Sequence, residues 1–522
     1  MTTSGRAEKL GEILLATSLI TSENLNKAIA AQAKTGKRLG QILVEQGAAT
    51  EDDIAWALSN QLMYPYIFIS RDIIDDEVVR LLPEAFLREH RVLPIQRFGQ
   101  QVTLAMADPT DEHTVDEVAA QTGLQVNRAV ALASNIEATL RQMPSQQPRT
   151  AKRRPQGPEA QYLKFHLAHA LNEGAFEIHF DQAGDGQHRV RYRLQGILVD
   201  RAGHPEELHA GLIRHLREFA GLGDAPSAAA ALTVSIGEVE VRAIVSVVPA
   251  TKGPAATIAL YPYRSAVPDL VPLGVGRKTV QALQGALAGA HGALLIGCAD
   301  PLVRSTLIRA ILHATPREKV WALETLPVFR HPGITQTPID ASALAAPLLA
   351  GPFGAGSDLV AVDDASHAAT LVAAFERGRA QRVIVGHPQD DAVGLIAQVL
   401  DAAGSALVAS TLAGVLAARP IRLLCPQCKE RVRHGSAANG RHTFTPRGCA
   451  ACSLTGFRGY RVLTEMWLPR AKDRGWMRGS PRETALARLG QATGPSMRGQ
   501  GHAFVDDGLT SVAELTRVLE GS

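Results

Sequence analysis

The sequence has no long apolar run, little excess charge of either sign and few cysteines. No stretch reaches the roughly 18 residues that a membrane-spanning helix needs, and residues 1–6 lead into an amphipathic segment, which predicts that no signal peptide is present. The net charge of +3 neither favours nor excludes nucleic acid, because positive charge must be clustered to bind it, and we expect no nucleic acid polymer as a partner. The composition, 46% hydrophobic and 20% charged over 522 residues, is typical of a soluble protein of about three or four domains.

The one dense basic run marks a boundary between two kinds of sequence. Arg149, Lys152, Arg153 and Arg154 lie in a Pro- and Gln-rich stretch, residues 143–158, which we interpret as a solvated linker; a weak membrane-surface role is the alternative. The sequence before this linker is helical and repetitive. After it, short apolar runs such as 292–297 and 359–362 alternate with helical segments, a pattern that predicts a mostly parallel sheet in an α/β domain.

Four of the five cysteines form two close pairs. Cys425 and Cys428 are separated by 20 residues from Cys449 and Cys452. Two thiolates three positions apart can reach one metal ion, and a second pair completes a tetrahedral shell, so the spacing predicts a structural zinc ribbon. Two disulfides are the alternative, which a reducing cytosol disfavours. The fifth, Cys298, stands alone in an apolar stretch and is expected to be a small core residue.

Two N-terminal segments repeat at a distance of 29 residues, the separation of Lys9 and Arg38. Each has a basic-Leu-Gly triplet, leucines at helical spacing and a closing glutamine, which predicts two helical hairpins whose second helices start near Thr21 and Thr50. Thr50 with Asp53 has the form of a capping box. Core packing alone would explain the leucines, but the repeated triplet and glutamine favour a ligand with two similar halves. The candidate binding residues are Lys9, Leu10, Gly11, Gln32, Arg38, Leu39, Gly40 and Gln61.

These two copies resemble the cyclic di-GMP-binding domain at the N-terminus of many type II secretion and type IV pilus assembly ATPases. The resemblance implies a helical domain at residues 1–70 with cyclic di-GMP as its regulatory ligand. The second copy fits the motif at its polar positions, whereas the first has Lys9 for arginine and Ser18 for glycine. Residues 71–142 resemble the second N-terminal domain of the same family, a small α+β docking domain with strands at 92–94 and 101–105.

The rest of the chain resembles the same assembly ATPases. The similar segments are 174–180 with Glu177 in an acidic box, 191–196, 406–429 and 449–465. The resemblance implies a multidomain α/β protein. An α+β domain at 159–266 would precede a RecA-like ATPase-type domain at 267–522, whose zinc module would occupy 422–465.

The phosphate loop of the family is largely missing. A loop for phosphoryl transfer needs glycines, a lysine for the terminal phosphates and a hydroxyl for Mg²⁺. In register with it stands Gly297-Cys-Ala-Asp-Pro-Leu-Val-Arg-Ser-Thr306, where only Gly297, Ser305 and Thr306 match. Pro301 removes an amide donor, Asp300 adds negative charge, and the lysine position is Val303. Arg304 lies one place away and could supply charge only if the loop shifted.

Other phosphate-binding and catalytic positions are reduced as well. The arginines expected after residue 220 are absent from 221–231. Asp363 aligns roughly with the catalytic glutamate, Glu324 remains from a Glu-Asp pair, and His387 is what is left of a histidine box. A structural alternative is that Asp363 and Glu324 are only solvated groups at strand ends, with Glu324 capping a helix.

These departures predict a cytoplasmic relative of the secretion ATPases that does not hydrolyse ATP at a useful rate. Glu324, Asp363 and Arg304 would be vestigial catalytic residues, and binding of ATP and Mg²⁺ is doubtful. We expect a cyclic di-GMP-responsive scaffold or regulator, peripheral at the inner membrane, that docks on platform proteins of a secretion or pilus machine. It would form a hexamer, or a mixed ring with an active paralogue. A working ATPase with an unorthodox phosphate loop is the alternative.

Overall fold

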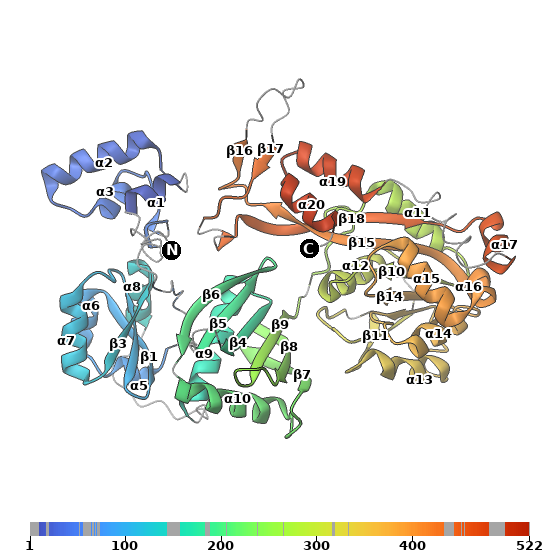
Figure 1. Ribbon diagram of the computed structural model, residues 1–522, viewed down its shortest axis with the longest axis horizontal. Helices are drawn as coiled ribbons and strands as arrows, with labels where there is room; N and C mark the ends of the chain where they lie inside the picture. The colour runs from blue at the N-terminus through green and yellow to red at the C-terminus, as the bar shows by residue number, and fades with distance from the viewer. Residues whose placement is uncertain are drawn as a thin grey trace. The chain divides into compact units, whose positions relative to one another are not determined.

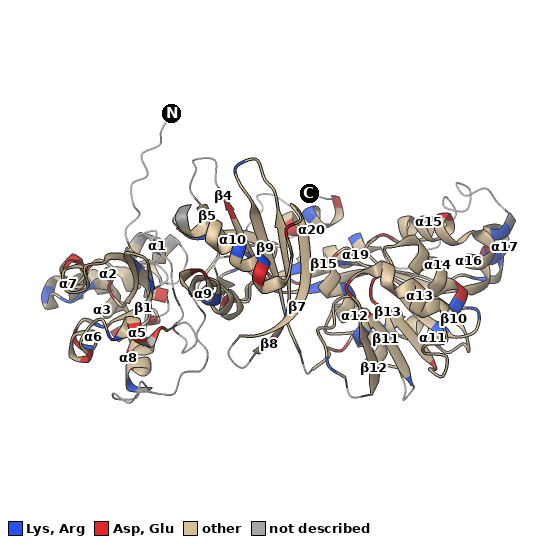
Figure 2. Cartoon of the chain, turned by 90° about the horizontal axis from the view of Figure 1, so that it is seen from below, with Lys and Arg blue, Asp and Glu red and all other residues tan. Residues whose placement is uncertain are grey.

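The computed structural model describes most of the chain, and its described residues fall into two compact units. The first unit comprises residues 1–260, 425–429 and 446–457, and the second comprises 261–424, 430–445 and 458–522. Acidic and basic residues are interspersed along both units (Figure 2). The residues described are 10–16, 20–51, 53–55, 64, 67, 69, 74–142, 157–182, 188–204, 206–236, 239–264, 266–315, 319–331, 333–432, 443–449, 452–453, 455–479 and 496–520.

The N-terminal repeat is helical, as predicted. Its helices are α1 (Leu10–Ala16), α2 (Ser22–Thr35) and α3 (Leu39–Glu45) (Figure 1). Thr21 caps α2 by accepting a hydrogen bond from the Asn24 amide. At the equivalent place of the second copy, the Thr50 amide donates to Asp53 and the Asp53 amide donates to the Thr50 hydroxyl. This reciprocal pair confirms the capping box.

A small α+β layer follows the repeat. Its three strands lie in the order β1-β2-β3, with β1 and β2 antiparallel and β2 and β3 parallel. The strands predicted near residues 92 and 101 are therefore confirmed. The elements are α5 (Asp76–Val79), α6 (Glu84–His90), β1 (Val92–Phe98), β2 (Gln101–Met106), α7 (Glu112–Thr122), β3 (Gln125–Val130) and α8 (Ala133–Gln142). The linker lies outside the described residues except for its last two, where Gly157 is the N-cap of the next helix.

The next part of the chain, from α9 to β9, is a six-stranded sheet with two helices. The strand order is β6-β5-β4-β9-β8-β7, and all strand pairs recorded for it are antiparallel. The elements are α9 (Pro158–Glu173), β4 (Glu177–Gln182), β5 (His188–Leu194), β6 (Ile197–His204), α10 (Glu206–Ala220), β7 (Ala228–Ile236), β8 (Val239–Val248) and β9 (Ala255–Pro262).

The second unit is built on a seven-stranded sheet of order β12-β11-β13-β14-β10-β15-β18. Strands β10, β11, β13 and β14 run parallel, so their carboxyl ends meet at one edge. The elements are α11 (Arg277–Leu287), β10 (Gly292–Gly297), α12 (Pro301–His313), β11 (Val320–Glu324), β12 (Ile334–Pro338), α13 (Ala345–Ala350), β13 (Leu359–Val362), α14 (Ala368–Arg377), β14 (Arg382–His387), α15 (Ala392–Ala403), α16 (Ser405–Thr411), β15 (Leu412–Leu424), β16 (Glu430–Val432), β17 (Thr443–Thr445), β18 (Phe457–Trp467), α17 (Ala471–Gly479), α19 (Met497–Asp506) and α20 (Val512–Glu520).

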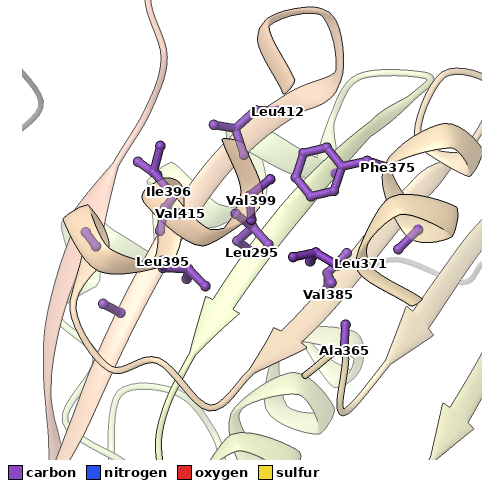
Figure 3. Close-up of a cluster of buried hydrophobic side chains, with 14 of the residues drawn as sticks. Leu295, Ala365, Leu371, Phe375, Val385, Leu395, Ile396, Val399, Leu412 and Val415 are labelled. Atoms are coloured by element: carbon purple, nitrogen blue, oxygen red, sulfur yellow. The ribbon is translucent and has the colours of Figure 1, made fainter. Parts of the chain in front are cut away.

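Both faces of this sheet are buried, which explains why its inner strands are continuous apolar runs. Leu295 on β10 packs with Phe375 of α14 and Val399 of α15 on one face (Figure 3). The next residue, Ile296, packs with Leu307 of α12 on the other face. The two predicted apolar strands, 292–297 and 359–362, have these bounds in the structure. Ligands of open parallel sheets bind at the carboxyl ends of the strands, and the candidate site lies there.

Candidate functional site

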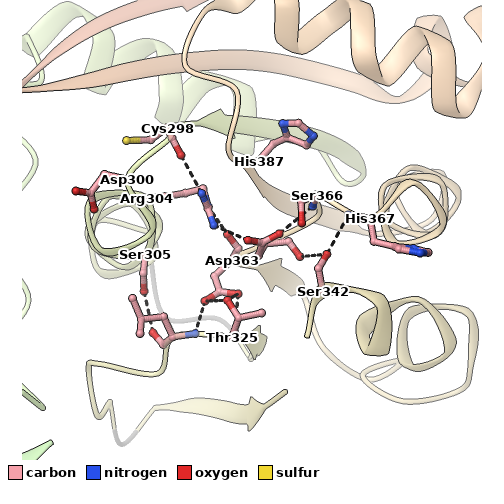
Figure 4. A network of polar contacts seen from close by, with 12 residues as sticks. Cys298, Asp300, Arg304, Ser305, Thr325, Ser342, Asp363, Ser366, His367 and His387 are labelled. Carbon is pink, nitrogen blue, oxygen red and sulfur yellow. Dashed lines mark hydrogen bonds and ion pairs between the residues drawn. The ribbon is translucent and has the colours of Figure 1, made fainter. Parts of the chain in front are cut away.

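The polar residues expected in the phosphate site gather where β10, β11 and β13 end (Figure 4). Residues 298–300 connect β10 to α12, residues 325–326 follow β11, and residues 363–364 follow β13. The parallel topology thus brings together Arg304, Ser305, Asp363 and the end of β11 from segments far apart in the sequence. His387 closes β14 at the same edge, where its ring nitrogen Nδ1 accepts from the Gln389 amide and burial lowers its pKa.

The N-terminus of α12 is capped by a carboxylate of the chain itself. Asp300 is the N-cap residue, and its side chain accepts from the Val303 amide at 3.0 Å. Pro301 occupies the first turn, where it supplies no amide hydrogen. Gly297 is needed for packing, because a Cβ at that position would lie 2.3 Å from the Gln389 carbonyl oxygen. The helix N-terminus, where a phosphate would bind in a nucleotide site, therefore already has an anion.

Arg304 points into the protein and is only 2% exposed. Its Nε donates to the Asp363 carbonyl oxygen at 2.7 Å and one terminal nitrogen donates to the Cys298 carbonyl oxygen at 2.9 Å. The other terminal nitrogen pairs with the Asp364 carboxylate at 2.6 Å. These contacts join the segments that follow β10 and β13, so the guanidinium is a structural link within the unit.

Asp363 is buried, and its carboxylate faces the end of β11. It accepts from the Thr325 amide at 2.8 Å and from the Leu326 amide at 2.9 Å, and the Thr325 hydroxyl lies within hydrogen-bonding distance. Burial raises the pKa of Asp363 despite these two amide donors. The structural alternative, in which Asp363 is a solvated group at a strand end, is wrong, because Asp363 is buried and its partners lie inside the fold.

Glu324 forms a second buried pair, on the other side of β11's end. Its carboxylate pairs with Arg309 of α12 and accepts from the Gln336 side chain at 2.8 Å. Burial, partly offset by Arg309, raises the pKa of Glu324 to about 7. The alternative that Glu324 caps a helix is also wrong, since it is the last residue of a strand and its oxygens face side chains. Arg309 was missed by sequence reasoning, although a charged residue amid the apolar run 307–312 was the available signal.

The two hydroxyls that match the phosphate loop are bonded to main-chain carbonyls. The Ser305 hydroxyl donates to the Leu326 carbonyl oxygen at 3.2 Å, and the Thr306 hydroxyl donates to the Leu302 carbonyl oxygen one turn earlier at 2.7 Å. Both residues are buried in α12. These bonds fix the orientation of both hydroxyl groups. The Ser305 hydroxyl points toward the segment after β11, and the Thr306 hydroxyl points back along its own helix.

In the helical repeat, the motif glycines lie at close contacts between helices and the motif arginine is exposed. A Cβ on Gly11 would lie 2.9 Å from Leu25, and a Cβ on Gly40 would lie 2.7 Å from Ile54, the residue 29 positions after Leu25. The glycines therefore allow close helix packing in both copies. Arg38 pairs with Asp108, and its side chain is 62% exposed. The Gln32 side chain donates to the Lys37 carbonyl, Leu10 and Leu39 are partly buried, and Lys9 and Gln61 lie outside the described residues.

The four paired cysteines form one buried cluster. Their sulfurs all lie within 4.8 Å of one another. The Cys425–Cys449 and Cys428–Cys452 sulfurs are both 3.8 Å apart, and Cys449–Cys452 are 3.7 Å apart. Four thiolates at about 2.3 Å from a tetrahedral Zn²⁺ would be separated by about 3.8 Å. The cluster could bind a metal such as zinc. All five cysteines are free, and Cys298 is buried in the core as expected.

Comparison with known proteins defines the class of this fold. The type II/IV secretion system protein family matches residues 152–343 and 367–517, and an MshEN domain matches residues 62–150. The ATPase DotB of Legionella pneumophila has a similar fold, with a TM-score of 0.50 at 13% identity over 73% of this chain and 99% of that chain. The chain belongs to the type II/IV secretion system protein family.

Two relatives are similar over nearly their whole length. The type IV pilus assembly ATPase PilB of Myxococcus xanthus is 24% identical over 97% of this chain and 98% of its own. A putative type II secretion system protein E of Escherichia coli is 25% identical over 90% of this chain and 97% of its own. In the described part of the chain, no single helix has the length and apolarity to span a membrane, although the bent pair α15–α16 passes that test jointly.

Proposed function

We propose that the chain is a component of a type II secretion or type IV pilus assembly machine that does not hydrolyse ATP at a useful rate. Membership of the secretion ATPase family supports the machine. The observation that carries the loss of hydrolysis is the burial of Arg304, whose guanidinium is bonded to Cys298, Asp363 and Asp364. Arg304 is the strongest candidate in the loop to replace the lysine, and it is already used inside the fold.

The residues of the loop do not fit a triphosphate with Mg²⁺. The lysine position is Val303, which is buried, and the helix N-terminus is capped by Asp300. A phosphate at this place would meet the Asp300 carboxylate and would lack the amide of Pro301. Since stabilisation of developing charge by such donors is usually the largest catalytic term, their loss removes most of the rate enhancement.

We further propose that the helical repeat makes the chain responsive to cyclic di-GMP. A domain of the MshEN type, which binds cyclic di-GMP, matches residues 62–150, directly after the repeat; this match supports a cyclic di-GMP-responsive N-terminal region and does not include the repeat residues themselves. The exposure of Arg38 also supports this function, because an exposed guanidinium can grip a phosphate or stack on a base. Gly11 and Gly40 would hold the two copies close enough to bind one ligand with two similar halves.

The chain would act as a scaffold or regulator in the cytoplasm, at the inner membrane. Its partners would be platform proteins of the machine, and it would assemble as a hexamer or as a mixed ring with an active paralogue.

The cysteine cluster would hold one zinc ion per chain, as its sulfur spacing supports. Metal analysis of the purified protein should give one zinc, lost in Cys428→Ser and kept in Cys298→Ala. Retention of zinc in Cys428→Ser would contradict this assignment.

A working ATPase with an unorthodox loop is the second candidate function. It is favoured by the presence of a cation, Arg304, beside the lysine position and of carboxylates at the ends of β11 and β13. For Arg304 to reach a phosphate, it would have to leave three partners, and Asp364 would lose its paired cation.

Turnover of Mg²⁺·ATP by the full chain separates the two candidates. We expect no phosphate release above that of an Arg304→Ala preparation purified in parallel, which controls for contaminating ATPases. Asp363→Asn serves as a second control, because it keeps the shape of the side chain. Turnover that is present in the unaltered chain and abolished in both variants would establish the ATPase.

A further inference from the structure

The position of Arg304 in the loop corresponds to a metal ligand in functional phosphate loops. In the pattern G-x-x-x-x-G-K-[ST], the residue after the lysine supplies the hydroxyl that binds Mg²⁺. Counting from Gly297, this residue is Arg304. The chain thus has a cationic side chain at the helix position from which a hydroxyl would normally hold a cation.

The surroundings of the Arg304 guanidinium consist of oxygens. It contacts the carbonyl oxygens of Cys298 and Asp363 and the Asp364 carboxylate, at distances between 2.6 and 2.9 Å. In phosphate-loop proteins, Mg²⁺ lies between this loop and an acidic residue at the end of a neighbouring strand. The guanidinium lies between the same two kinds of segment, the loop after β10 and the acidic pair after β13 (Figure 4).

Asp300 complements this arrangement with a negative charge. Its carboxylate caps α12 through the Val303 amide, at the helix terminus that attracts phosphate in nucleotide sites. One anion and one cation of the chain itself, at the N-cap and in the first turn of α12, thus lie at this end of the sheet.

We propose that the Arg304 guanidinium takes the place of the divalent cation and the Asp300 carboxylate that of a phosphate, so that this unit is assembled without a nucleotide. The proposal rests on the loss of hydrolysis argued above, and it deepens that function. In a ligand-dependent domain, Mg²⁺ and nucleotide would hold these strand ends together; here α12, β10 and β13 are joined permanently. A scaffold within a ring would then keep one conformation while neighbouring motors cycle.

The proposal predicts a latent cation site. Arg304→Ser removes the guanidinium and restores a hydroxyl, which would leave an oxygen-lined vacancy beside the Asp364 carboxylate. Oxygen ligands with a carboxylate suit Mg²⁺ and Ca²⁺. The variant should therefore gain a dependence on divalent cations that the unaltered chain does not have.

Thermal unfolding of the full-length protein without nucleotide tests this, in EDTA alone and in the same EDTA with a millimolar excess of Mg²⁺ or Ca²⁺, so that any zinc of the cysteine cluster is removed equally from both samples. We expect the Tm of the unaltered chain to be insensitive to the cation. Arg304→Ser should unfold several degrees lower in EDTA, and the cation should restore part of the loss. In Arg304→Ser with Asp364→Asn, this restoration should disappear, since the carboxylate is gone.

Three results would overturn the proposal. They are an unchanged Tm for Arg304→Ser in EDTA, a destabilised Arg304→Ser that no divalent cation restores, and equal stabilisation of the unaltered chain by the cation. If Arg304→Ser does not fold in EDTA, Asp364→Asn alone replaces it: its Tm should fall and be insensitive to cations, and an unchanged Tm would count against the proposal. Because no nucleotide is present, the outcome is independent of whether the chain binds or hydrolyses ATP.

Discussion

The two arginines on which the functional account depends differ in what surrounds them. Arg38, in the helical repeat, is 62% exposed and makes one ion pair, with Asp108. Arg304, in the phosphate-loop position, is 2% exposed and bonds to three residues in two segments of the second unit. A ligand can reach the first by displacing one half-buried partner, Asp108, whereas the second is part of the core. The comparison teaches that a charged motif residue signals binding only when its side chain remains available.

Removing each arginine should therefore affect stability very differently. Arg304→Ala leaves Asp364 and two carbonyl oxygens without their partner and should cost about 3–5 kcal/mol, the usual penalty for breaking a buried pair. Arg38→Ala should cost less than about 1 kcal/mol, as for exposed ion pairs. Denaturant unfolding followed by far-UV circular dichroism measures this, because both units contain helices, whereas fluorescence of Trp321 and Trp467 reports the second unit alone. Equal stabilities of the two variants would remove the distinction.

Glu324, beside the degenerate phosphate loop, should make the stability of the second unit depend on pH. Its folded pKa of about 7 exceeds the ordinary value of 4.5, chiefly because of burial. The folded state therefore holds a proton that the unfolded chain releases, and this stability is present below about pH 4.5 and lost as the pH rises to about 7. Over this range the unaltered chain should lose about 1–3 kcal/mol more than Glu324→Gln, which cannot ionise. Parallel slopes for the two proteins would show that Glu324 titrates normally.

The exposed arginine should instead govern ligand affinity. Arg38→Ala should weaken cyclic di-GMP binding by about tenfold or more, because a charge-assisted contact is lost. Lys37→Ala is the matched control, a neighbouring exposed cation that pairs with Glu45 and is absent from the motif. Arg304→Ala, if folded, should bind as the unaltered chain does. Isothermal titration gives all four affinities. If Arg38→Ala binds cyclic di-GMP as tightly as the unaltered chain, Arg38 does not contact the ligand.

The smallest expected effect concerns the partner of Arg38. Asp108 is held by Thr110, whose amide and hydroxyl both donate to its Oδ1, and its other oxygen faces Arg38. Asp108→Asn should release Arg38 and raise cyclic di-GMP affinity by a few-fold, since an exposed ion pair contributes up to about 1 kcal/mol. Glu84→Gln, which breaks an exposed pair with Arg88 in the same layer, should leave affinity unchanged. Weaker binding by Asp108→Asn would show that Asp108 contacts the ligand.

Local features of the fold were predictable from the sequence. The bounds of β10 and β13 follow from their apolar runs, since strands buried on both faces need no polar alternation. The Thr50–Asp53 capping box depends on residues three positions apart. The fates of Glu324 and Asp363 could not be predicted in this way, because their burial depends on α12, Gln336 and the segment after β11. Likewise, the partners of Arg304 at 363 and 364 are close only because β10 and β13 are both parallel to β14.

Titration of the full chain with Mg²⁺·ATP tests the central claim most directly, by isothermal calorimetry with Arg304→Ala as a reference. A loop whose anion and cation sites are filled by Asp300 and Arg304 should give no saturable heat up to millimolar nucleotide. Saturable binding with a micromolar Kd in the unaltered chain, lost in Arg304→Ala, would contradict the account.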